Sequence, residues 1–400
     1  MSSNDSIWCI QADDDAPAHV LEYLNNPSNF CTFSQGLTEL IVKYGYHEPP
    51  LDLDAKTSFV LSKLSLTGAS VSRSTVKDWF SDKHRPAFAS NSRTLMFRLC
   101  FALSASCSDV IWFFHRVYFD RCFNCHTIEE AVYYYCFSNG LAYPHAESLL
   151  EQIDSYPAVP VCHTASHVYT TDIRNRLDEC TNDQQLLDFF RENKSIFTEW
   201  NKSALRYIKQ YVTDIQGRQK DKEVIKAWRA GKTILPAECR DCSLIIQEYL
   251  FCRSGDRLDY IRGRNITSID FMLDRMILIY SGLHKATSIP AIVKTNFPSK
   301  RTFSDILNNS ETLTSYDSIR KCLILLKFYH FWVNLLLNPA SADYSLFDVF
   351  QEETNALLTS CGYDELYSGN PYDWLFLWAS TTEHPLNALR GVLSTLEESA

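Results

Sequence analysis

The sequence predicts an all-α protein, and three observations lead to that fold class. The 400 residues include only 12 Gly and 14 Pro, so residues that favour turns are scarce. They also include 24 Phe, 21 Tyr and 8 Trp, which supply large side chains for a core. Apolar residues recur at helical spacing, and no convincing run longer than four residues alternates as a half-buried strand does. At this length we expect two or three domains.

The first predicted domain follows a short N-terminal segment, residues 1–30. This segment carries Asp13-Asp14-Asp15 and the turn signal Asn25-Asn26-Pro27, so we expect a tail or a short helix on the surface. Ser or Asp stands at the start of several of the helices that follow, as an N-cap should. Residues 31–120 are expected to form one small domain of five helices, at 33–44, 54–64, 72–81, 92–103 and 106–119.

Helical spacing continues through a middle domain, residues 121–287, and a C-terminal domain, residues 288–400. Prolines interrupt the pattern at 155–168 and 288–302, where they mark two connecting segments. The expected helices are 128–139, 144–154, 172–180, 183–193, 197–215, 303–307, 316–337, 345–361 and 385–396. The predicted architecture is a five-helix N-terminal domain followed by a larger, irregular helical region.

Charge is distributed unevenly along a chain whose net charge is −10. Residues 69–98 contain six basic and two acidic residues, and residues 206–232 contain eight basic and three acidic ones. Residues 302–400 contain four basic and thirteen acidic residues. The total argues against indiscriminate nucleic-acid binding, whereas the N-terminal and middle thirds have local positive charge. We expect the acidic last third to face a protein or solvent.

The start of the chain lacks the basic and then apolar pattern of a secretory signal, so we expect a cytoplasmic protein. Many of the 14 cysteines have apolar neighbours, which is typical of free thiols in a reducing compartment, and we expect no disulfide. The most apolar stretch, residues 322–337, contains Lys327 and His330 and is short for a membrane span. We therefore expect no membrane partner.

The segment Gly68-Ala-Ser-Val-Ser-Arg-Ser-Thr-Val-Lys-Asp-Trp79, followed by Lys83-His-Arg-Pro86, resembles the lambda-repressor and Cro-like helix-turn-helix family. In that family a Ser-x-Ser-Thr-Val/Ile-x-x-Trp helix precedes a short basic loop that ends in Pro. The resemblance extends over residues 33–119, with 54–64 as the helix before the turn. It implies that helix 72–81 enters the major groove of duplex DNA.

The resemblance places the DNA contacts on one face of helix 72–81 and on the loop after it. Arg73 is the candidate for a guanine contact, because Arg pairs with the guanine edge in the major groove. The other basic residues would contact phosphates, which position the protein without reading sequence. The serines lie near the helix N-terminus, whose free N–H groups suit phosphate. The candidate DNA-binding residues are Ser72, Arg73, Ser74, Lys77, Lys83 and Arg85.

Two features depart from the family pattern. Asp82 stands where the family usually has a Gly in the left-handed conformation; Asp tolerates that conformation but adds negative charge towards DNA. The turn before the helix is lengthened by residues 66–70. Asp82, together with the acidic last third of the chain, motivates an alternative in which the motif contacts a protein, as in a host-defence or interaction protein.

Two C-terminal stretches, Arg320-Lys-Cys-Leu-Ile-Leu-Leu-Lys-Phe-Tyr329 and Gly369-Asn-Pro-Tyr-Asp-Trp374, resemble a group of uncharacterised bacterial proteins associated with mobile genetic elements. The resemblance implies no particular activity and no site. We expect this region to form a homo-oligomer or to sense a partner.

Several shorter patterns match other chemistry only in part. The C-x-x-C pairs at 122–125 and 239–242 have the spacing that holds zinc, but they lie 114 positions apart. Cys162, His163 and His167 lack a fourth ligand. We therefore expect no metal and no cofactor.

Arg121 and His126 have the Arg-x4-His spacing of the helical ribonuclease family known as HEPN, although the polar residue usual after the Arg is missing. That resemblance implies that Arg121 stabilises the scissile phosphate and that His126 assists proton transfer. Three functions stay open at this point. The sequence favours a sequence-specific DNA-binding regulator without enzymatic activity over an interaction protein and over a ribonuclease.

Overall fold

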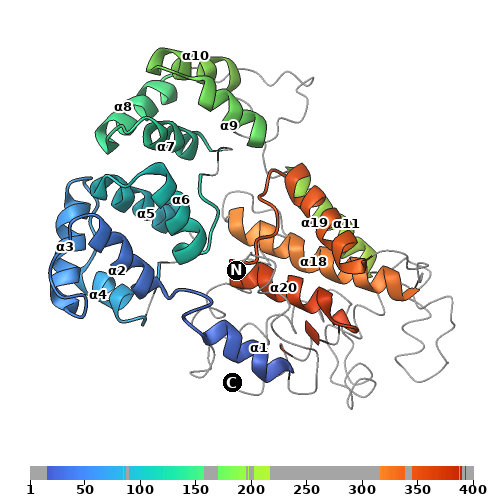
Figure 1. Ribbon diagram of the computed structural model, residues 1–400. Helices are drawn as coiled ribbons and strands as arrows, with labels where there is room; N and C mark the ends of the chain where they lie inside the picture. Colours follow the sequence, from blue (N-terminus) through green and yellow to red (C-terminus); the bar gives the residue numbers. More distant parts are fainter. Residues whose placement is uncertain are drawn as a thin grey trace. The chain divides into compact units, whose positions relative to one another are not determined.

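A computed structural model describes residues 16–83, 85–86, 90–123, 125, 127–156, 170–194, 197, 202–216, 316–337, 345–386, 388–389 and 392. Within these ranges the regular structure is helical and contains no strand, which confirms the predicted all-α fold class (Figure 1). No helix in these ranges combines the length and the apolar character needed to cross a bilayer.

The chain divides into two compact units, which we describe separately. Unit 2 comprises Pro27–Lys202 and Thr359–Asp364, and unit 1 comprises Met1–Asn26, Ser203–Leu358 and Glu365–Ala400. The predicted domain limits at residues 30, 120 and 287 stay a prediction. The predicted connecting segment 288–302 lies outside the described residues, as does 155–168 apart from its first two residues.

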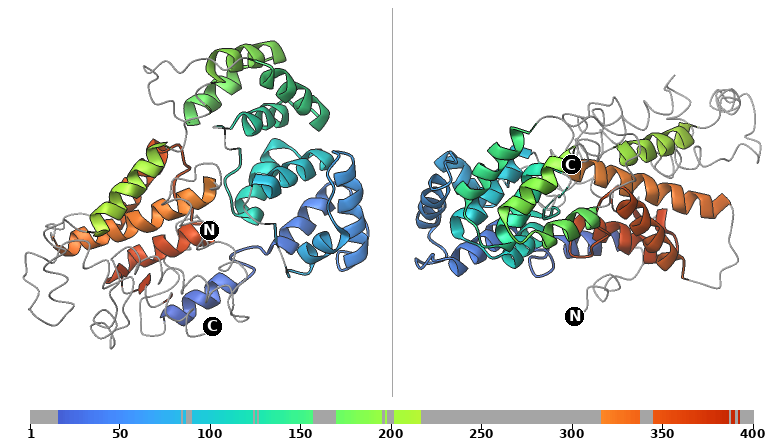
Figure 2. Two further views of the ribbon diagram at one scale, coloured as in Figure 1. Left: turned by 180° about the vertical axis from the view of Figure 1, so that it is seen from behind. Right: turned by 90° about the horizontal axis from the view of Figure 1, so that it is seen from above.

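Each helix of unit 2 begins and ends within two residues of its predicted bounds, except the helix predicted at 106–119. Figures 1 and 2 show how these helices are arranged. Ser72 and Ser106, which stand at predicted helix starts, each accept a hydrogen bond from the first helical turn. Thr32, Asp52 and Asn182 cap three further helices in the same way. In chain order the helices of unit 2 are α2 (Phe33–Lys43), α3 (Leu53–Ser65), α4 (Arg73–Phe80), α5 (Ser90–Leu103), α6 (Cys107–Phe113), α7 (Ile128–Ser138), α8 (Tyr143–Asp154), α9 (Thr170–Glu179) and α10 (Asp183–Asn193).

The predicted helix 106–119 changes geometry part-way. α6 ends at Phe113, and Phe114–Tyr118 form a π-helix. Phe119 follows with φ of 55°, a left-handed conformation that is costly for a bulky side chain. Phe119 is buried, with its ring edge-on to Phe30 at 6.4 Å between centroids, and this packing helps to hold the turn. The α-helical spacing of the sequence gave no sign of the change.

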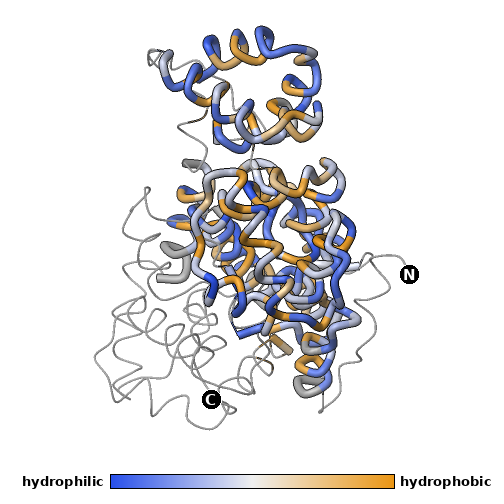
Figure 3. The backbone as a smooth tube through the Cα atoms, turned by 90° about the vertical axis from the view of Figure 1, so that its left-hand side faces the viewer, coloured by the Kyte–Doolittle hydropathy of each residue, from blue (hydrophilic) through white to orange (hydrophobic). Residues whose placement is uncertain are grey.

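One hydrophobic cluster extends through unit 2 from α2 to Phe197. Apolar positions recur along its helices, as Figure 3 shows. Phe97 of α5 stacks on Phe114 at 4.3 Å and on Phe123 at 5.4 Å. The aromatic runs 112–114 and 133–135 lie in this cluster or pack against it.

A buried ionic cluster lies beside these rings. Arg93 of α5 donates to Asp120 Oδ2 at 2.6 Å and to Glu130 Oε2 of α7 at 2.7 Å. It also donates to the main-chain carbonyl of Arg121. Buried charges need such complete pairing, so this cluster fixes how α5 meets α7.

Unit 1 contains α1 (Ala16–Asn25), α11 (Lys202–Gln216), α18 (Tyr316–Leu337), α19 (Leu346–Ser360) and α20 (Pro371–Thr381). The first residue of α11 and the last two residues of α19 belong to unit 2. α18 has its predicted bounds. The predicted helix 303–307 lies outside the described residues, and so does much of 385–396.

Residues 16–25 form a helix and not a tail. Val20 and Leu24 are buried, and the Tyr23 ring stacks on Trp374 of α20 with 4.5 Å between centroids. In the same unit Arg320 of α18 makes a two-point ion pair with Asp373 of α20, at 2.8 and 2.7 Å. The Tyr23–Trp374 contact thus joins an N-terminal helix to one near the C-terminus, and the ion pair joins α18 to α20.

Candidate nucleic-acid interface

α4 is held by one apolar face. Val76, Trp79 and Phe80 are buried, and α4 packs against α2 and α3. The Trp79 ring lies edge-on to Phe33 of α2, at 6.1 Å between centroids. Because these residues bury one face, the opposite face of α4 is the one available to a partner.

Local hydrogen bonds stabilise the lengthened turn between α3 and α4. Gly68 has φ of 67°, a conformation that glycine adopts without strain. The buried Thr67 hydroxyl donates to the Leu64 carbonyl at 2.9 Å, and the Ala69 N–H donates to the same carbonyl at 3.2 Å. The extra residues therefore extend the end of α3 without loosening the motif.

Ser72 and Ser74 form the exposed start of α4. The Ser72 hydroxyl accepts a hydrogen bond from the Thr75 N–H at 3.1 Å and so caps the helix. It also lies 2.9 Å from the Ser74 hydroxyl and 2.7 Å from the Thr75 hydroxyl. Ser72 thus has a structural contact within α4 in addition to its predicted place on the DNA-binding face.

Arg73 and Lys77 converge on one carboxylate, that of Asp54 in the first turn of α3. Lys77 Nζ lies 3.1 Å from Asp54 Oδ1, and Arg73 Nη2 lies 3.4 Å from the same oxygen. The Lys77 hydrogen bond and charge, followed by Arg73, hold the pKa of Asp54 below its ordinary value. Arg73 and Asp54 are exposed, and Lys77 is half-buried. Sequence reasoning missed Asp54, because its partners lie 19 and 23 positions away along the chain.

Asp82 adopts the left-handed conformation expected from its position in the motif, with φ of 52°. Its carboxylate accepts from the Ser34 N–H and from the Thr32 hydroxyl, each at 3.2 Å. Asp82 therefore supports the N-terminus of α2, where a negative charge is favourable. This contact gives the carboxylate a place within the fold that the sequence did not predict.

The two basic residues after α4 differ in their surroundings. Lys83 is exposed. Arg85 is partly buried; it donates to the main-chain carbonyl of Tyr118, and its guanidinium lies over the rings of Tyr118 and Phe119, at 5.8 and 5.5 Å. Arg85 thus links the loop to the π-helix, whereas Arg73 and Lys77 share their partner on α3.

Arg121, the first residue of the predicted ribonuclease pair, is buried inside unit 2. Its guanidinium donates to the Gly362 carbonyl at 2.6 Å and pairs with Asp364 Oδ2 at 3.1 Å. His126 lies outside the described residues. Arg121 therefore has a structural contact, and the ribonuclease function stays a prediction.

Of the two C-x-x-C pairs, only the cysteines of 122–125 lie among the described residues, and both are buried. Burial raises the pKa of the Cys125 thiol to about 11 and that of Cys122 well above its ordinary value. Thiolates are the form that binds zinc, so burial works against a metal at this pair. Across the described ranges no group of three or more His, Cys, Asp or Glu side chains could hold a metal ion. The patterns at 162–167 and 239–242 lie outside those ranges.

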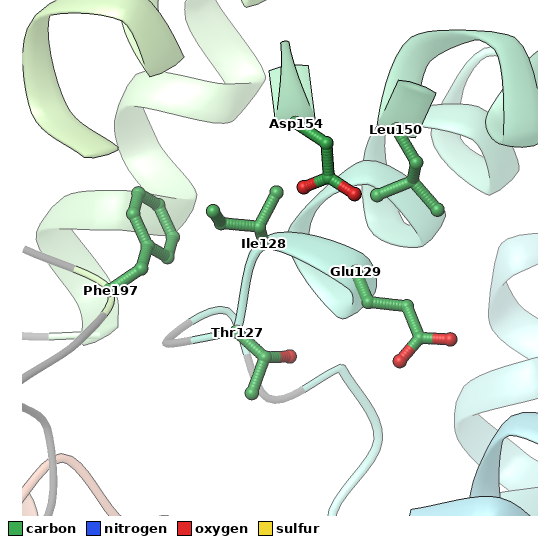
Figure 4. Close-up of a pocket in the computed structure, with 6 residues that line it drawn as sticks. All are labelled: Thr127, Ile128, Glu129, Leu150, Asp154 and Phe197. Atoms are coloured by element: carbon green, nitrogen blue, oxygen red, sulfur yellow. The ribbon is translucent and has the colours of Figure 1, made fainter. Parts of the chain in front are cut away.

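A cavity of about 460 Å³ lies between α7, α8 and Phe197 (Figure 4). Two carboxylates line it, and of these Glu129 accepts hydrogen bonds from Tyr133 and Thr94, at 2.8 and 3.2 Å. The lining residues are Thr127, Ile128, Glu129, Leu150, Asp154 and Phe197. The carboxylates would repel phosphate, so the cavity adds nothing to a nucleic-acid interface.

Comparison with known protein families, curated proteins and solved structures gives no match to this chain.

Proposed function

We propose that this protein is a sequence-specific DNA-binding regulator in which α4 contacts duplex DNA. The proposal depends chiefly on the first turn of α4. Residues 72–75 are exposed there, while Val76, Trp79 and Phe80 bury the other face. A short helix anchored in this way, with Arg73 at its exposed N-terminus, suits entry into the major groove.

In this proposal each basic residue has its own role. Arg73 contacts a guanine through N7 and O6, which Arg can bind with two hydrogen bonds. Lys77 and Lys83 contact phosphates, and Arg85 adds positive charge where the loop meets the π-helix. Ser74 contributes a hydroxyl at the helix N-terminus, and Ser72 keeps that end of α4 formed. The C-terminal helical region forms a homo-oligomer or senses a protein partner, because the negative charge of residues 302–400 would repel DNA.

The test begins with selection of duplexes from a random library by the full-length protein. Fluorescence anisotropy then compares a selected duplex with a scrambled one for wild type, Arg73→Ala and Arg191→Ala. Arg191 is an exposed residue of α10. Arg191→Ala removes the same charge as Arg73→Ala but outside α4, so it is the matched control. We expect Arg73→Ala to weaken binding to the selected duplex by about 1–3 kcal/mol and the control to leave it nearly unchanged. Failure to enrich any sequence, or equal losses in the two variants, contradicts the proposal.

A second function is favoured by the two carboxylates of the motif. Asp54 and Asp82 lower the positive charge around α4, and a surface of mixed charge suits protein contact better than DNA contact. In this alternative the helix-turn-helix binds a protein, as in a host-defence or interaction protein. The same experiment separates the two: a folded wild-type protein that shows no sequence preference supports protein contact.

A further inference from the structure

The cavity between α7, α8 and Phe197 combines an apolar wall with two carboxylates (Figure 4). Its volume of about 460 Å³ lies within the ~300–1,000 Å³ of typical small-molecule sites. Ile128, Leu150 and the Phe197 ring form the wall. The ring is buried and packs against that of Phe190, with 5.1 Å between centroids, so this side of the cavity is fixed. The cavity therefore offers a ligand both apolar and charged contacts.

Glu129 supplies the first carboxylate, and only one of its two oxygens is occupied. Tyr133 and Thr94 both donate to Oε1, at 2.8 and 3.2 Å. Among the residues that the structure describes, none donates to Oε2. Glu129 is half-buried, so these two contacts hold its negative charge in place at the edge of the cavity. A charge held in this way binds a cation without first losing side-chain freedom.

Asp154, at the end of α8, supplies the second carboxylate. It is exposed, and its carboxylate has no hydrogen bond or ion pair with the described part of the chain. Lys194 lies nearby but donates to main-chain carbonyls, those of Ile153, Asp154 and Tyr156, at 2.9, 3.3 and 3.0 Å. Its positive charge makes Asp154 the weaker acceptor for a cation. Glu129 is therefore the main anchor of the cavity.

We propose that this cavity binds an aliphatic amine, whose ammonium group donates to Glu129 Oε2. A carboxylate accepts strong, charge-assisted hydrogen bonds from such a group. The methylene chain of the amine lies against Ile128 and Leu150, where it leaves water. In a diamine or polyamine a second ammonium group contacts Asp154. A hydrated metal ion would not use the apolar wall, and an anion would be repelled.

This inference goes beyond the proposed function, because the residues of the cavity lie outside α4 and its loop. Isothermal titration calorimetry of the full-length protein tests it with putrescine, spermidine and butylamine. Butanediol with terminal hydroxyls has the chain length of putrescine without its charge, and magnesium chloride supplies the charge without the chain. Salt at about 150 mM screens general attraction to the acidic protein. We expect saturable binding of the amines, tightest for spermidine and putrescine, and none of butanediol or magnesium.

Three variants locate the site. Glu129→Gln removes the charge and keeps an oxygen that can accept from Tyr133 and Thr94. We expect it to weaken putrescine binding by about five- to tenfold. Asp154→Asn should weaken putrescine binding by about two- to threefold and leave butylamine binding nearly unchanged. Glu151→Gln removes an exposed carboxylate of α8 outside the cavity, and as the matched control it should change either affinity by less than about twofold.

Thermal unfolding establishes that each variant is folded. Asp154 is exposed and its side chain has no contact to lose, so Asp154→Asn keeps the test decisive if Glu129→Gln does not fold. The absence of saturable amine binding to wild type overturns the inference. Equal losses in Glu129→Gln and Glu151→Gln, or displacement of putrescine by equimolar magnesium, overturn it too, because the amine would then be a general counterion. None of these results depends on whether the protein selects a DNA sequence.

Discussion

Arg93 of α5 and Glu130 of α7 form a two-point ion pair in which neither side chain is more than 10% exposed. Asp120 approaches the same guanidinium at 2.6 Å, so one buried cation serves two carboxylates. Burial opposes the charge of Arg93, but Asp120 and Glu130 more than offset this and raise its pKa well above the ordinary value. Loss of the Arg93 charge would therefore leave two buried carboxylates unpaired and would destabilise unit 2.

Replacing Arg93 with Met should strongly destabilise unit 2. Two buried carboxylates would lose their cation, and breaking a buried pair in this way costs about 3–5 kcal/mol. Denaturant unfolding of the full chain, followed by circular dichroism, measures the loss. Arg191→Met is the control, because Arg191 pairs with Asp188 on the surface, where such a pair contributes at most about 1 kcal/mol. Equal effects of the two variants would show that the buried cluster has no special role.

The cap of α4 gives a second prediction. Ser72→Ala removes the acceptor of the Thr75 N–H and should lower stability by about 1 kcal/mol. Ser72→Gly should lower it by only a few tenths of a kcal/mol, because Gly is tolerated at this position of a helix. The midpoint temperatures of thermal unfolding of Ser72→Ala and Ser72→Gly, each compared with wild type, measure the two losses of stability. A Gly variant as unstable as the Ala variant contradicts capping by Ser72.

The contact between α2 and the π-helix gives a third prediction. A methyl group added at Gly36 would lie well inside van der Waals contact of the Val117 side chain. Although Ala favours a helix over Gly, overpacking here should make Gly36→Ala destabilising by about 1–3 kcal/mol. Val117→Ala should then relieve the clash, so the double variant loses less stability than the two single losses combined. Additive losses in this double-mutant cycle would exclude the contact.

His115 should make the stability of unit 2 sensitive to mild acid. Burial lowers the pKa of its imidazole below the ordinary value of 6.5, so the unfolded chain binds the proton more readily than the folded chain does. Stability is therefore fully present above pH 6.5 and falls as the pH decreases towards the folded pKa. Unfolding measured between about pH 7.5 and 5 should show less of this loss in His115→Gln than in wild type. His47→Gln, which removes an exposed imidazole, is the control and should behave as wild type does.

Much of the helical pattern could be predicted because most helices have a buried and an exposed face. α10 and α18 have the predicted bounds, and capping residues mark many of the starts. α20 was missed for a physical reason: Pro371–Ser380 are all buried, so the helix has no polar face to give a periodic signal. Its start is nevertheless marked by Asn370, which accepts hydrogen bonds from the first turn, followed by Pro371.

The candidate site was predictable only in part. The buried stripe of α4 and the left-handed Asp82 followed from local sequence, since both depend on neighbouring residues. The partners of Arg73, Asp82 and Arg85 lie on other helices, at Asp54, Ser34 and Tyr118. Contacts over such separations depend on how the helices pack, and no spacing in the sequence reports them.

Because Tyr23 stacks on Trp374, α1 can complete its packing only when synthesis of the chain is nearly finished. At ~5–20 residues per second, Trp374 is added roughly 20 to 70 s after Tyr23. Residues Pro27–Lys202 emerge as one continuous stretch in between, and the part of unit 2 that follows later is only Thr359–Asp364. α1 thus leaves the exit tunnel long before its partner exists, with Val20 and Leu24 available meanwhile to chaperones and to other nascent chains.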